Sequence, residues 1–329
     1  MTTISALARR PISLWVEELA LQDVLFFVYL GVGMALLASQ SLGAERPEHA
    51  AGLIAYHALL AVLGGSAIAL RAWRRNAITI FIRWWYPVLL FTLCFEAVGR
   101  MIHMMQPGLI DARLVEADQW LFGEVLTPVL QGYARPWLTE IMYIFYSSYY
   151  FLIPGVGLAL YVQGTSGQQG QPQLAFRKYL LTVSLTFWVC YVHFLFTPAG
   201  GPVFWPAYPG PVFDLTGGPV TALEQWVFQH GTIVGGAFPS SHVAVAFVCA
   251  VFAIRFAVVP WLVVPLSIGL AISTVYAGYH YGVDVLYGVI VGAAVTLMAE
   301  GLSRMAARVG AVGSQSTAMP RPALLRRGF

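Results

Sequence analysis

Charged residues are scarce in this chain of 329 residues: Asp, Glu, Lys and Arg make up 10% of it, and hydrophobic residues make up 58%. Ordinary soluble domains carry about one quarter charged residues, so the composition excludes a typical water-facing surface and predicts an integral membrane protein. The formal net charge of +3 comes from scattered arginines rather than a basic block, which excludes the electrostatic footprint of a nucleic-acid partner. The partner that this composition predicts is the lipid bilayer, and the abundant Trp and Tyr suit its two interfaces.

Cysteine is also rare. The three cysteines, Cys94, Cys190 and Cys249, lie in separate apolar runs and form no CxxC pair, which argues against a disulfide framework and a zinc site. No carboxylate cluster is present that would hold Mg²⁺, so we expect neither a metal nor another cofactor. The first twenty residues lack the apolar core and cleavage site of a signal peptide, and we expect them to form a cytoplasmic amphipathic lead-in.

Long apolar runs dominate what is present. A membrane-spanning helix needs roughly 20 mainly apolar residues. Eight segments fit this requirement: 22–42, 51–70, 84–103, 138–162, 179–197, 238–254, 257–276 and 281–302. They predict an all-α fold, a polytopic membrane helix bundle of about eight transmembrane helices. We divide the chain into the lead-in with two extra helices (1–75), a six-helix core (76–303) and a basic, disordered cytoplasmic tail (304–329).

The basic residues predict the orientation of these spans. Arg and Lys accumulate in cytoplasmic loops. Here they occupy the lead-in, the tail and alternate connections: Arg9, Arg10, Arg71, Arg74, Arg75, Arg83, Arg177, Lys178, Arg255, Arg304, Arg308, Arg321, Arg326 and Arg327. Both termini are then cytoplasmic, and residues 235–242 and 277–281 lie on the outer, periplasmic side of a bacterial inner membrane. The long outer connections 104–137 and 198–237 are expected to form a lid or cap.

The segment GGAFPSSHVAVAF at 235–247 places a histidine at the start of an apolar helix. Pro239 suits the first helical turn, and the amides of Ser240, Ser241 and His242 are then left without helical partners. Free amides at a helix N-terminus attract anions. We therefore predict that Ser240 and Ser241 bind an anionic substrate, and that His242 gives or takes a proton beside it.

The segment STVYAGYHYGVDVLYG at 273–288 holds His280, with Asp284 four residues later. If the eighth span begins near residue 280, both side chains lie on one helical face. Asp284 then fixes the tautomer of the His280 ring, whose other nitrogen is free to attack. The set suits phosphoryl transfer in two steps: His280 attacks phosphorus, and His242 protonates the leaving oxygen and then activates the incoming water or alcohol.

The order PSSH, then HYGVD, resembles two signatures of the type 2 phosphatidic acid phosphatase superfamily. The chain is most similar to its branch of aureobasidin-sensitive inositol phosphorylceramide synthases, which are inositolphosphotransferases, through FPSSH at 238–242, HYGVD at 280–284 and DQWLFG at 118–123. The resemblance covers residues 84–302. It implies a six-helix lipid-phosphatase-like core, a lipid phosphate substrate and a phosphohistidine intermediate. It also implies that His280 is the nucleophile, His242 the acid and base, and Asp284 the orienting carboxylate.

Two cations that the superfamily usually supplies are missing. Its first signature has a Lys and an Arg-Pro after the fifth span, where this chain reads FTPAGGPVFWP (196–206), and its third opens Ser-Arg, where this chain has Ser273-Thr274. The inositolphosphotransferase branch also tends to lack them. Arg100 is our candidate for a substrate-binding cation, because an arginine at such depth normally has a partner or a function. An ion pair with Glu96, four residues earlier, explains Arg100 equally well.

Together, these features predict a metal-independent membrane enzyme that cleaves or transfers a lipid-linked phosphate ester at the outer face. The resemblance favours head-group transfer to an alcohol acceptor, on a lipid or a sugar. Two alternatives stay open. One is a lipid phosphate phosphatase of the phosphatidic acid or polyprenyl phosphate type, in which water is the acceptor. The other is a non-catalytic lipid-phosphate binder or transporter, which the missing cations keep open.

Overall fold

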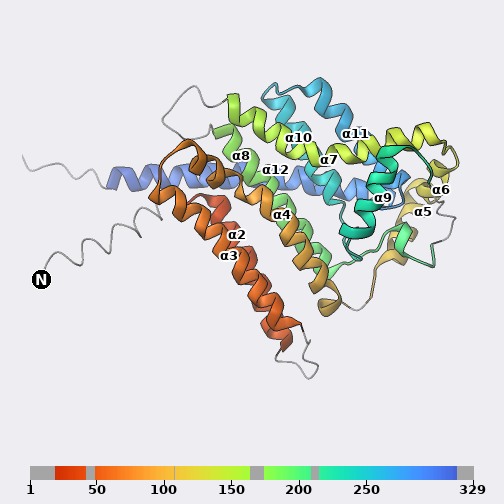
Figure 1. The fold of residues 1–329 in the computed structure, drawn as a ribbon, viewed down its shortest axis with the longest axis horizontal. Coiled ribbons are helices and arrows are strands. Elements are labelled where there is room, and N and C mark those ends of the chain that lie inside the picture. Colours follow the sequence, from red (N-terminus) through yellow and green to blue (C-terminus); the bar gives the residue numbers. More distant parts are fainter. Residues whose placement is uncertain (1–18, 42–48, 107, 164–173, 209–214, 317–329) are drawn as a thin grey trace, which may run out of the picture.

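The computed structural model describes residues 19–41, 49–106, 108–163, 174–208 and 215–316, without the side chains of 307–316. Within these residues the chain is helical apart from loops and two isolated β-bridges (Figure 1), which confirms the predicted all-α fold class. The helices are α2 (Leu21–Ser41), α3 (Ala50–Trp73), α4 (Ala77–Met105), α5 (Asp111–Phe122), α6 (Leu126–Gln131), α7 (Pro136–Gln163), α8 (Leu174–Phe196), the 3₁₀-helix η1 (Pro202–Phe204), α9 (Pro219–Gly231), α10 (Ser241–Arg255), α11 (Pro260–Tyr276) and α12 (Gly282–Ser316). Residues 1–18 of the predicted lead-in lie outside the described residues.

Six of the described helices are long and apolar enough to cross a membrane: α2, α3, α4, α7, α8 and α12. The protein is therefore an integral membrane protein. The sixth and seventh predicted spans correspond to α10 and α11, which have 15 and 17 residues and fall short of the roughly 20 that a straight crossing needs. The last helix continues to Ser316, so the first part of the predicted tail, 304–316, is helical.

Helix α8 lies at the centre of the bundle, and α2, α4, α10 and α12 all pack against it. It is apolar on all sides, as expected of a helix that other helices surround. Two of its buried hydroxyls, those of Thr182 and Thr186, each donate to the carbonyl four residues earlier. Such bonds let a hydroxyl sit in an apolar interior.

A buried polar contact joins α2, the first of the two extra helices, to α4. Asp23 of α2 pairs with Arg83 of α4, and the hydroxyl of Tyr86 donates to the same carboxylate at 2.7 Å. Asp23 and Arg83 are fully buried. Charges at this depth persist only when paired, so this contact fixes where α2 meets α4.

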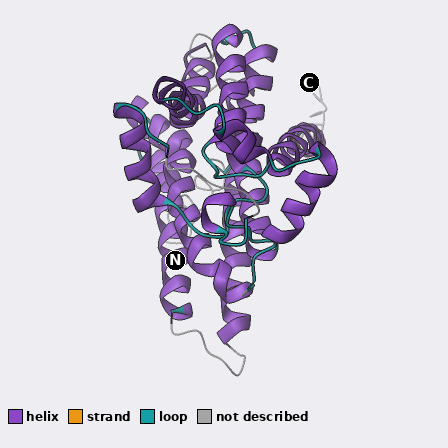
Figure 2. Cartoon of the chain, turned by 90° about the vertical axis from the view of Figure 1, so that its right-hand side faces the viewer, coloured by secondary structure: helices purple, strands orange, loops and turns teal. Residues whose placement is uncertain are grey.

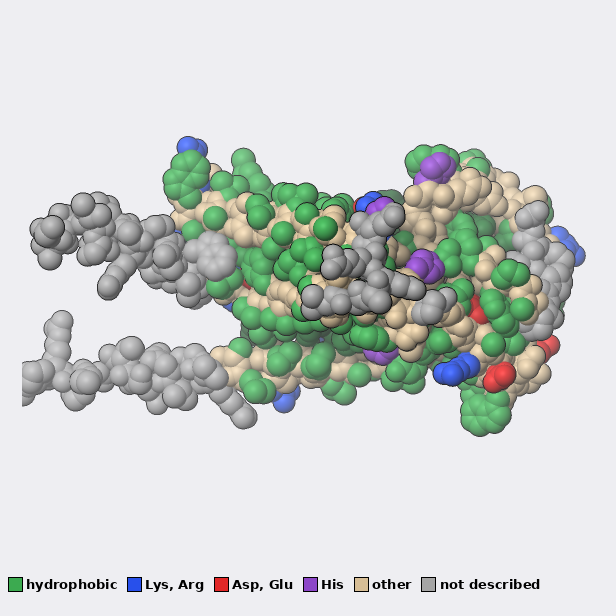
Figure 3. All heavy atoms as spheres, turned by 90° about the horizontal axis from the view of Figure 1, so that it is seen from below, with side chains coloured by type: hydrophobic (Ala, Val, Ile, Leu, Met, Phe, Trp, Pro, Cys, Tyr) green, Lys and Arg blue, Asp and Glu red, His purple; other side chains and the backbone are tan. Residues whose placement is uncertain are grey.

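The short helices α5, α6 and α9 gather at one end of the bundle, and the C-terminal part of α12 lies at the opposite end (Figure 1). Figure 2 looks onto the end with the short helices, where loops cross between them. In the view of Figure 3, hydrophobic side chains cover much of the body, and most of the visible acidic side chains lie toward the end with α5 and α6. The predicted outer connections thus form a layer of short helices over one end of the apolar bundle.

Candidate active site

Three loops meet under the short helices. The N–H of Ala199 donates to the carbonyl of Gly235 at 3.2 Å, and the N–H of Ala237 donates back to Ala199 at 2.9 Å. The N–H of Val203 donates to the carbonyl of Gly278 at 3.0 Å. Gly201 has a φ of +81°, and a Cβ at this position would collide with the carbonyl of Tyr279. These contacts join segments 199–203, 235–237 and 278–279 into one surface.

His242 lies in the first turn of α10, which begins at Ser241. The side chain of Ser240 is the N-cap and accepts from the N–H of Val243 at 3.4 Å, so Pro239 precedes the helix instead of starting it. The N–H of Ser240 donates to the carbonyl of Asp284 at 3.3 Å and is not free for an anion, contrary to our expectation. Ser241 and His242 line the cavity described below, whereas Ser240 is fully buried as the cap.

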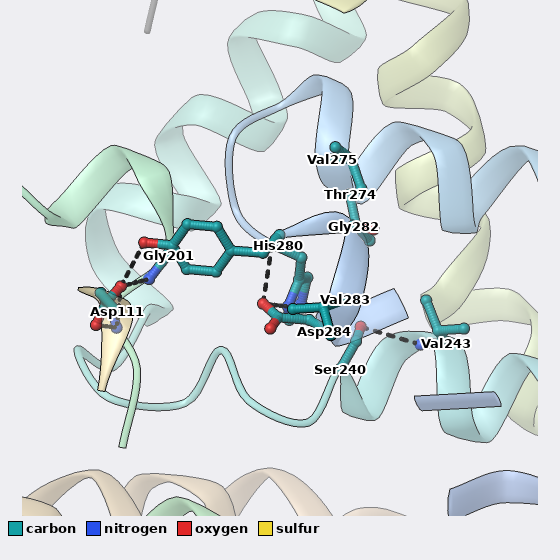
Figure 4. Close-up of polar contacts among 12 residues, drawn as sticks. Asp111, Gly201, Ser240, Val243, Thr274, Val275, His280, Gly282, Val283 and Asp284 are labelled. Atoms are coloured by element: carbon teal, nitrogen blue, oxygen red, sulfur yellow. Dashed lines mark hydrogen bonds and ion pairs between the residues drawn. The ribbon is translucent and has the colours of Figure 1, made fainter. Parts of the chain in front are cut away.

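His280 lies in the turn between α11 and α12. Because α12 begins at Gly282, His280 precedes the helix, and the predicted common helical face is wrong in that respect. Oδ2 of Asp284, in the first turn of α12, nevertheless lies 3.5 Å from Nδ1 of His280 (Figure 4). The same oxygen accepts the N–H of Tyr281 at 2.9 Å, which holds the carboxylate beside the ring.

The two histidines converge, as predicted. The centroids of the His242 and His280 rings are 5.7 Å apart, although the residues are far apart along the chain. The hydroxyl of Tyr146 lies 3.3 Å from Nε2 of His242. Burial lowers the pKa of His280 to about 4, against a smaller opposing effect of a backbone hydrogen bond with Ala237. At neutral pH the His280 ring is therefore neutral, which is the form that can attack phosphorus.

Two carboxylates of α5 bond to the residues around His280, and Figure 4 shows that of Asp111. Asp118 accepts the N–H groups of Gly282 and Val283 at 3.0 and 2.7 Å. Asp111 accepts the hydroxyl of Tyr281 at 2.7 Å and the N–H of Gly201 at 2.9 Å. Carboxylates thus already occupy the N-terminal amides of α12, so the N-terminus of α10 is the one that can meet an anion.

The histidines lie on the wall of a cavity of about 370 Å³ between α4, α7, α8, α9 and α10. The lining is mostly aromatic and aliphatic, and it includes residues of α9, so the predicted outer connection does cover the site. Among the residues that the structure describes, no Lys or Arg lines this cavity, and Glu224 of α9 is its one carboxylate. The missing cations of the two signatures are therefore not replaced at the described cavity wall.

Arg100 does not belong to this lining. Its guanidinium, 62% exposed, pairs with Glu96, which is the second of the two explanations considered above. The position where the superfamily resemblance implies an arginine holds Thr274, which is fully buried. A substrate role for Arg100 stays a prediction. Likewise, no group of three metal-ligating side chains occurs in the described part of the chain, and metal independence stays a prediction.

Sequence reasoning missed several residues of the site, namely Asp111, Tyr146, Tyr149 and Glu224. The first contacts backbone amides almost ninety positions away, and no local pattern reveals such a partner. Glu224 had a weak signal: it lies on an amphipathic helix that begins at Pro219, with Phe228 one turn later on the same face.

The comparisons with known proteins gave one match. A family model described as the PAP2 superfamily matches residues 112–298, which is more than half of the chain. The matched range contains both histidines, Asp284 and Asp118 of α5, and it begins one residue after Asp111. No curated protein and no solved structure matches the chain.

Proposed function

The chain belongs to the PAP2 superfamily, and from this premise we propose that it is an enzyme that cleaves or transfers a lipid-linked phosphate ester. One observation carries this proposal: two histidine rings, 5.7 Å apart, lie at a mostly apolar cavity between membrane helices. In the proposed complex the phosphate lies between the rings, and the apolar part of the lipid extends along α4 and α7.

The reaction has two steps. Nε2 of His280, the nitrogen that faces away from Asp284, attacks phosphorus, and the bond to the leaving oxygen breaks. Protonated His242 gives its proton to that oxygen, so the leaving alcohol departs neutral. His242 then takes a proton from the acceptor, whose oxygen attacks phosphorus and breaks the N–P bond. Asp284 stabilises the positive charge on His280 between the steps.

The phosphate charge is met without Lys or Arg at the described cavity wall. Ser241 and His242 line the cavity at the start of α10, where helix amides carry partial positive charge. The bound phosphate, as a neighbouring anion, favours the protonated form of the His242 ring, which then supplies a full positive charge in the first step. Ser240 supports this arrangement as the N-cap of α10, and Arg100 is a reserve candidate for the approach of the substrate.

Within this class we favour head-group transfer to an alcohol acceptor over transfer to water. FPSSH at 238–242 and HYGVD at 280–284 support the resemblance to the inositolphosphotransferase branch. We further propose a bacterial inner membrane, cytoplasmic termini and a periplasmic active site, because the basic residues occupy alternate connections.

The purified protein, incubated with a lipid labelled in its phosphate, separates the possible activities. A new labelled phospholipid in the presence of a lipid alcohol identifies transfer, and inorganic phosphate identifies a phosphatase. If no lipid phosphate is converted under either condition, the enzyme proposal fails and a non-catalytic binder remains.

Variants test the assigned roles. His280→Ala should lose activity by roughly 10⁴-fold or more. Asp284→Asn should lose roughly 10³–10⁴-fold, because its amide keeps an acceptor for Tyr281 but stabilises the wrong tautomer of His280. His230→Ala, at an exposed histidine of α9, is the matched control. Acid-labile phosphate trapped on His280 supports the mechanism, and full activity of His280→Ala refutes it.

A further inference from the structure

The charge of the cavity raises a question about the substrate. Glu224 lines it, is 3% exposed and accepts the hydroxyl of Ser147 at 2.6 Å. A phosphate and an ionised carboxylate in one apolar cavity repel each other. Among the described lining residues there is no Lys or Arg to offset them. A substrate that brings its own positive charge removes this conflict.

The surroundings of Glu224 suit such a charge. Tyr146, Tyr150 and Tyr279 line the same cavity. One turn after Glu224, Phe228 also lines it, and its ring stacks on Tyr279 with centroids 4.3 Å apart. Aromatic rings with a carboxylate are a known means of binding ammonium groups, because the ring faces carry partial negative charge.

Glu224 lies close to the histidines. Tyr146 and Ser147 are neighbours on α7: the hydroxyl of Tyr146 lies 3.3 Å from Nε2 of His242, and that of Ser147 bonds to Glu224. His242 and Glu224 are therefore contacted by two adjacent residues of α7, and both line the same cavity. One head group that carries both charges can reach these two parts of the cavity.

Ser147 can satisfy Glu224 in either protonation state. Its hydroxyl reaches the carboxylate at 2.6 Å and the carbonyl of Tyr143 at 2.8 Å, but it has one proton to donate. An ionised Glu224 accepts that proton. A neutral Glu224 instead donates to Ser147, which donates to Tyr143. Burial raises the pKa of Glu224, and a bound cation acts in the opposite direction, so the site can change its charge with its occupant.

We infer that this cavity binds a phospholipid whose head group carries an ammonium group. The phosphate lies at His242 and His280, and the nitrogen lies between Glu224 and the rings of Tyr146, Tyr279 and Phe228. The inference rests on the proposed function and names its substrate class. Ethanolamine and choline head groups share this chemistry. A polyol head group brings no counter-charge for Glu224, and it is an outcome of the test.

Equilibrium binding to the full-length His280→Ala protein tests the inference without turnover. Short-chain phosphatidylcholine, phosphatidylethanolamine and phosphatidylglycerol with identical chains are the probes. At least one amine lipid should bind about tenfold more tightly than the glycerol lipid, and the two amine lipids show which ammonium group is preferred. The double variant His280→Ala, Glu224→Gln should lose the preference for the amine lipid. Adding Glu116→Gln, at an exposed acid of α5, should preserve it.

Equal binding of the three lipids, or a preference that survives Glu224→Gln, overturns the inference. Competition by ethanolammonium and tetramethylammonium ions on the protein with Glu224 intact gives a second measurement in case the variant misfolds. At least one ion should weaken amine-lipid binding more than glycerol-lipid binding, and no effect of either is contrary evidence. Failure of the proposed function is distinct: the protein would bind amine lipids selectively but convert no lipid phosphate.

Discussion

Single side chains decide how the site handles charge. Thr274 lies where the superfamily resemblance implies an arginine, and its carbonyl accepts the N–H groups of Tyr279 and His280 at 3.0 and 3.2 Å. It thus shapes the turn that carries the nucleophile but adds no charge. Because no arginine supplies a fixed positive charge at this position, the charge next to the phosphate depends more strongly on the protonation states of His242 and His280.

The buried state of His280 predicts the acidic side of the pH profile. The nucleophile must be neutral, and burial lowers its pKa to about 4. The apparent kcat/KM should therefore rise with pH through about 4, and no limb should appear near 6.5, the ordinary value for histidine. Initial rates with one lipid phosphate check this result. A limb near 6.5 would contradict the burial argument.

The same shift affects stability, which has to be controlled in that experiment. The unfolded chain takes up a proton at His280 near pH 6.5, and the folded chain does so only near 4. Stability therefore falls as the pH falls between these values. Thermal unfolding at each pH identifies the range in which the protein is folded, and only rates from that range enter the profile.

At the scale of helices, α5 holds the start of α12. Asp118 is 1% exposed and accepts two amides of the first turn of α12, just after His280. Burial raises its pKa, and the bonds from Val283 and Gly282 act in the opposite direction. A carboxylate at a helix N-terminus accepts hydrogen bonds from the free amides and interacts favourably with the helix dipole. Asp118 is thus a positioning residue for His280.

Asp118→Asn tests this role. The amide keeps one acceptor oxygen but turns its NH₂ toward the second N–H, so we expect a loss of about 1 kcal/mol in the free energy of unfolding. Asp118 bonds to Gly282, which lies two residues after His280. A shift of this turn misplaces the nucleophile, so kcat should fall by about tenfold, with KM much less affected. Unfolding and initial-rate measurements check both, with Glu116→Gln as the control on the same helix. A lower melting temperature with unchanged kcat would leave Asp118 a purely structural cap.

The helices also show which parts of the site the sequence could predict. The length of the apolar runs predicted the spanning helices. The order of the motifs predicted that His242, His280 and Asp284 meet, because each lies at or next to a helix start. The contacts of Asp118 and Asp111 were beyond such reasoning, although Asp118 opens the DQWLFG segment, since their partners lie far away along the chain. The position of Arg100 within a predicted spanning segment suggested a function. In the structure its guanidinium pairs with Glu96, on the same helix.

The whole molecule has one chemically distinct end. Hydrophobic side chains cover much of the body on the face that Figure 3 shows, and α5, α6 and α9 cap the end that contains the histidines (Figure 1). The described basic residues Arg74, Arg177, Lys178, Arg255 and Arg304 belong to connections or helix ends that we assign to the other side. By the positive-inside rule, we propose that the capped end faces the periplasm.

Labelling of single introduced cysteines tests this orientation. Gln119 of α5 and Arg74 after α3 are both exposed, and Cys94, Cys190 and Cys249 are buried, so the unmodified chain gives little background. In bacterial cells permeable only at the outer membrane, a membrane-impermeant maleimide should label Gln119→Cys. It should label Arg74→Cys only after lysis. The reverse pattern would place the histidines on the cytoplasmic face, because α5 contacts the residues that flank His280.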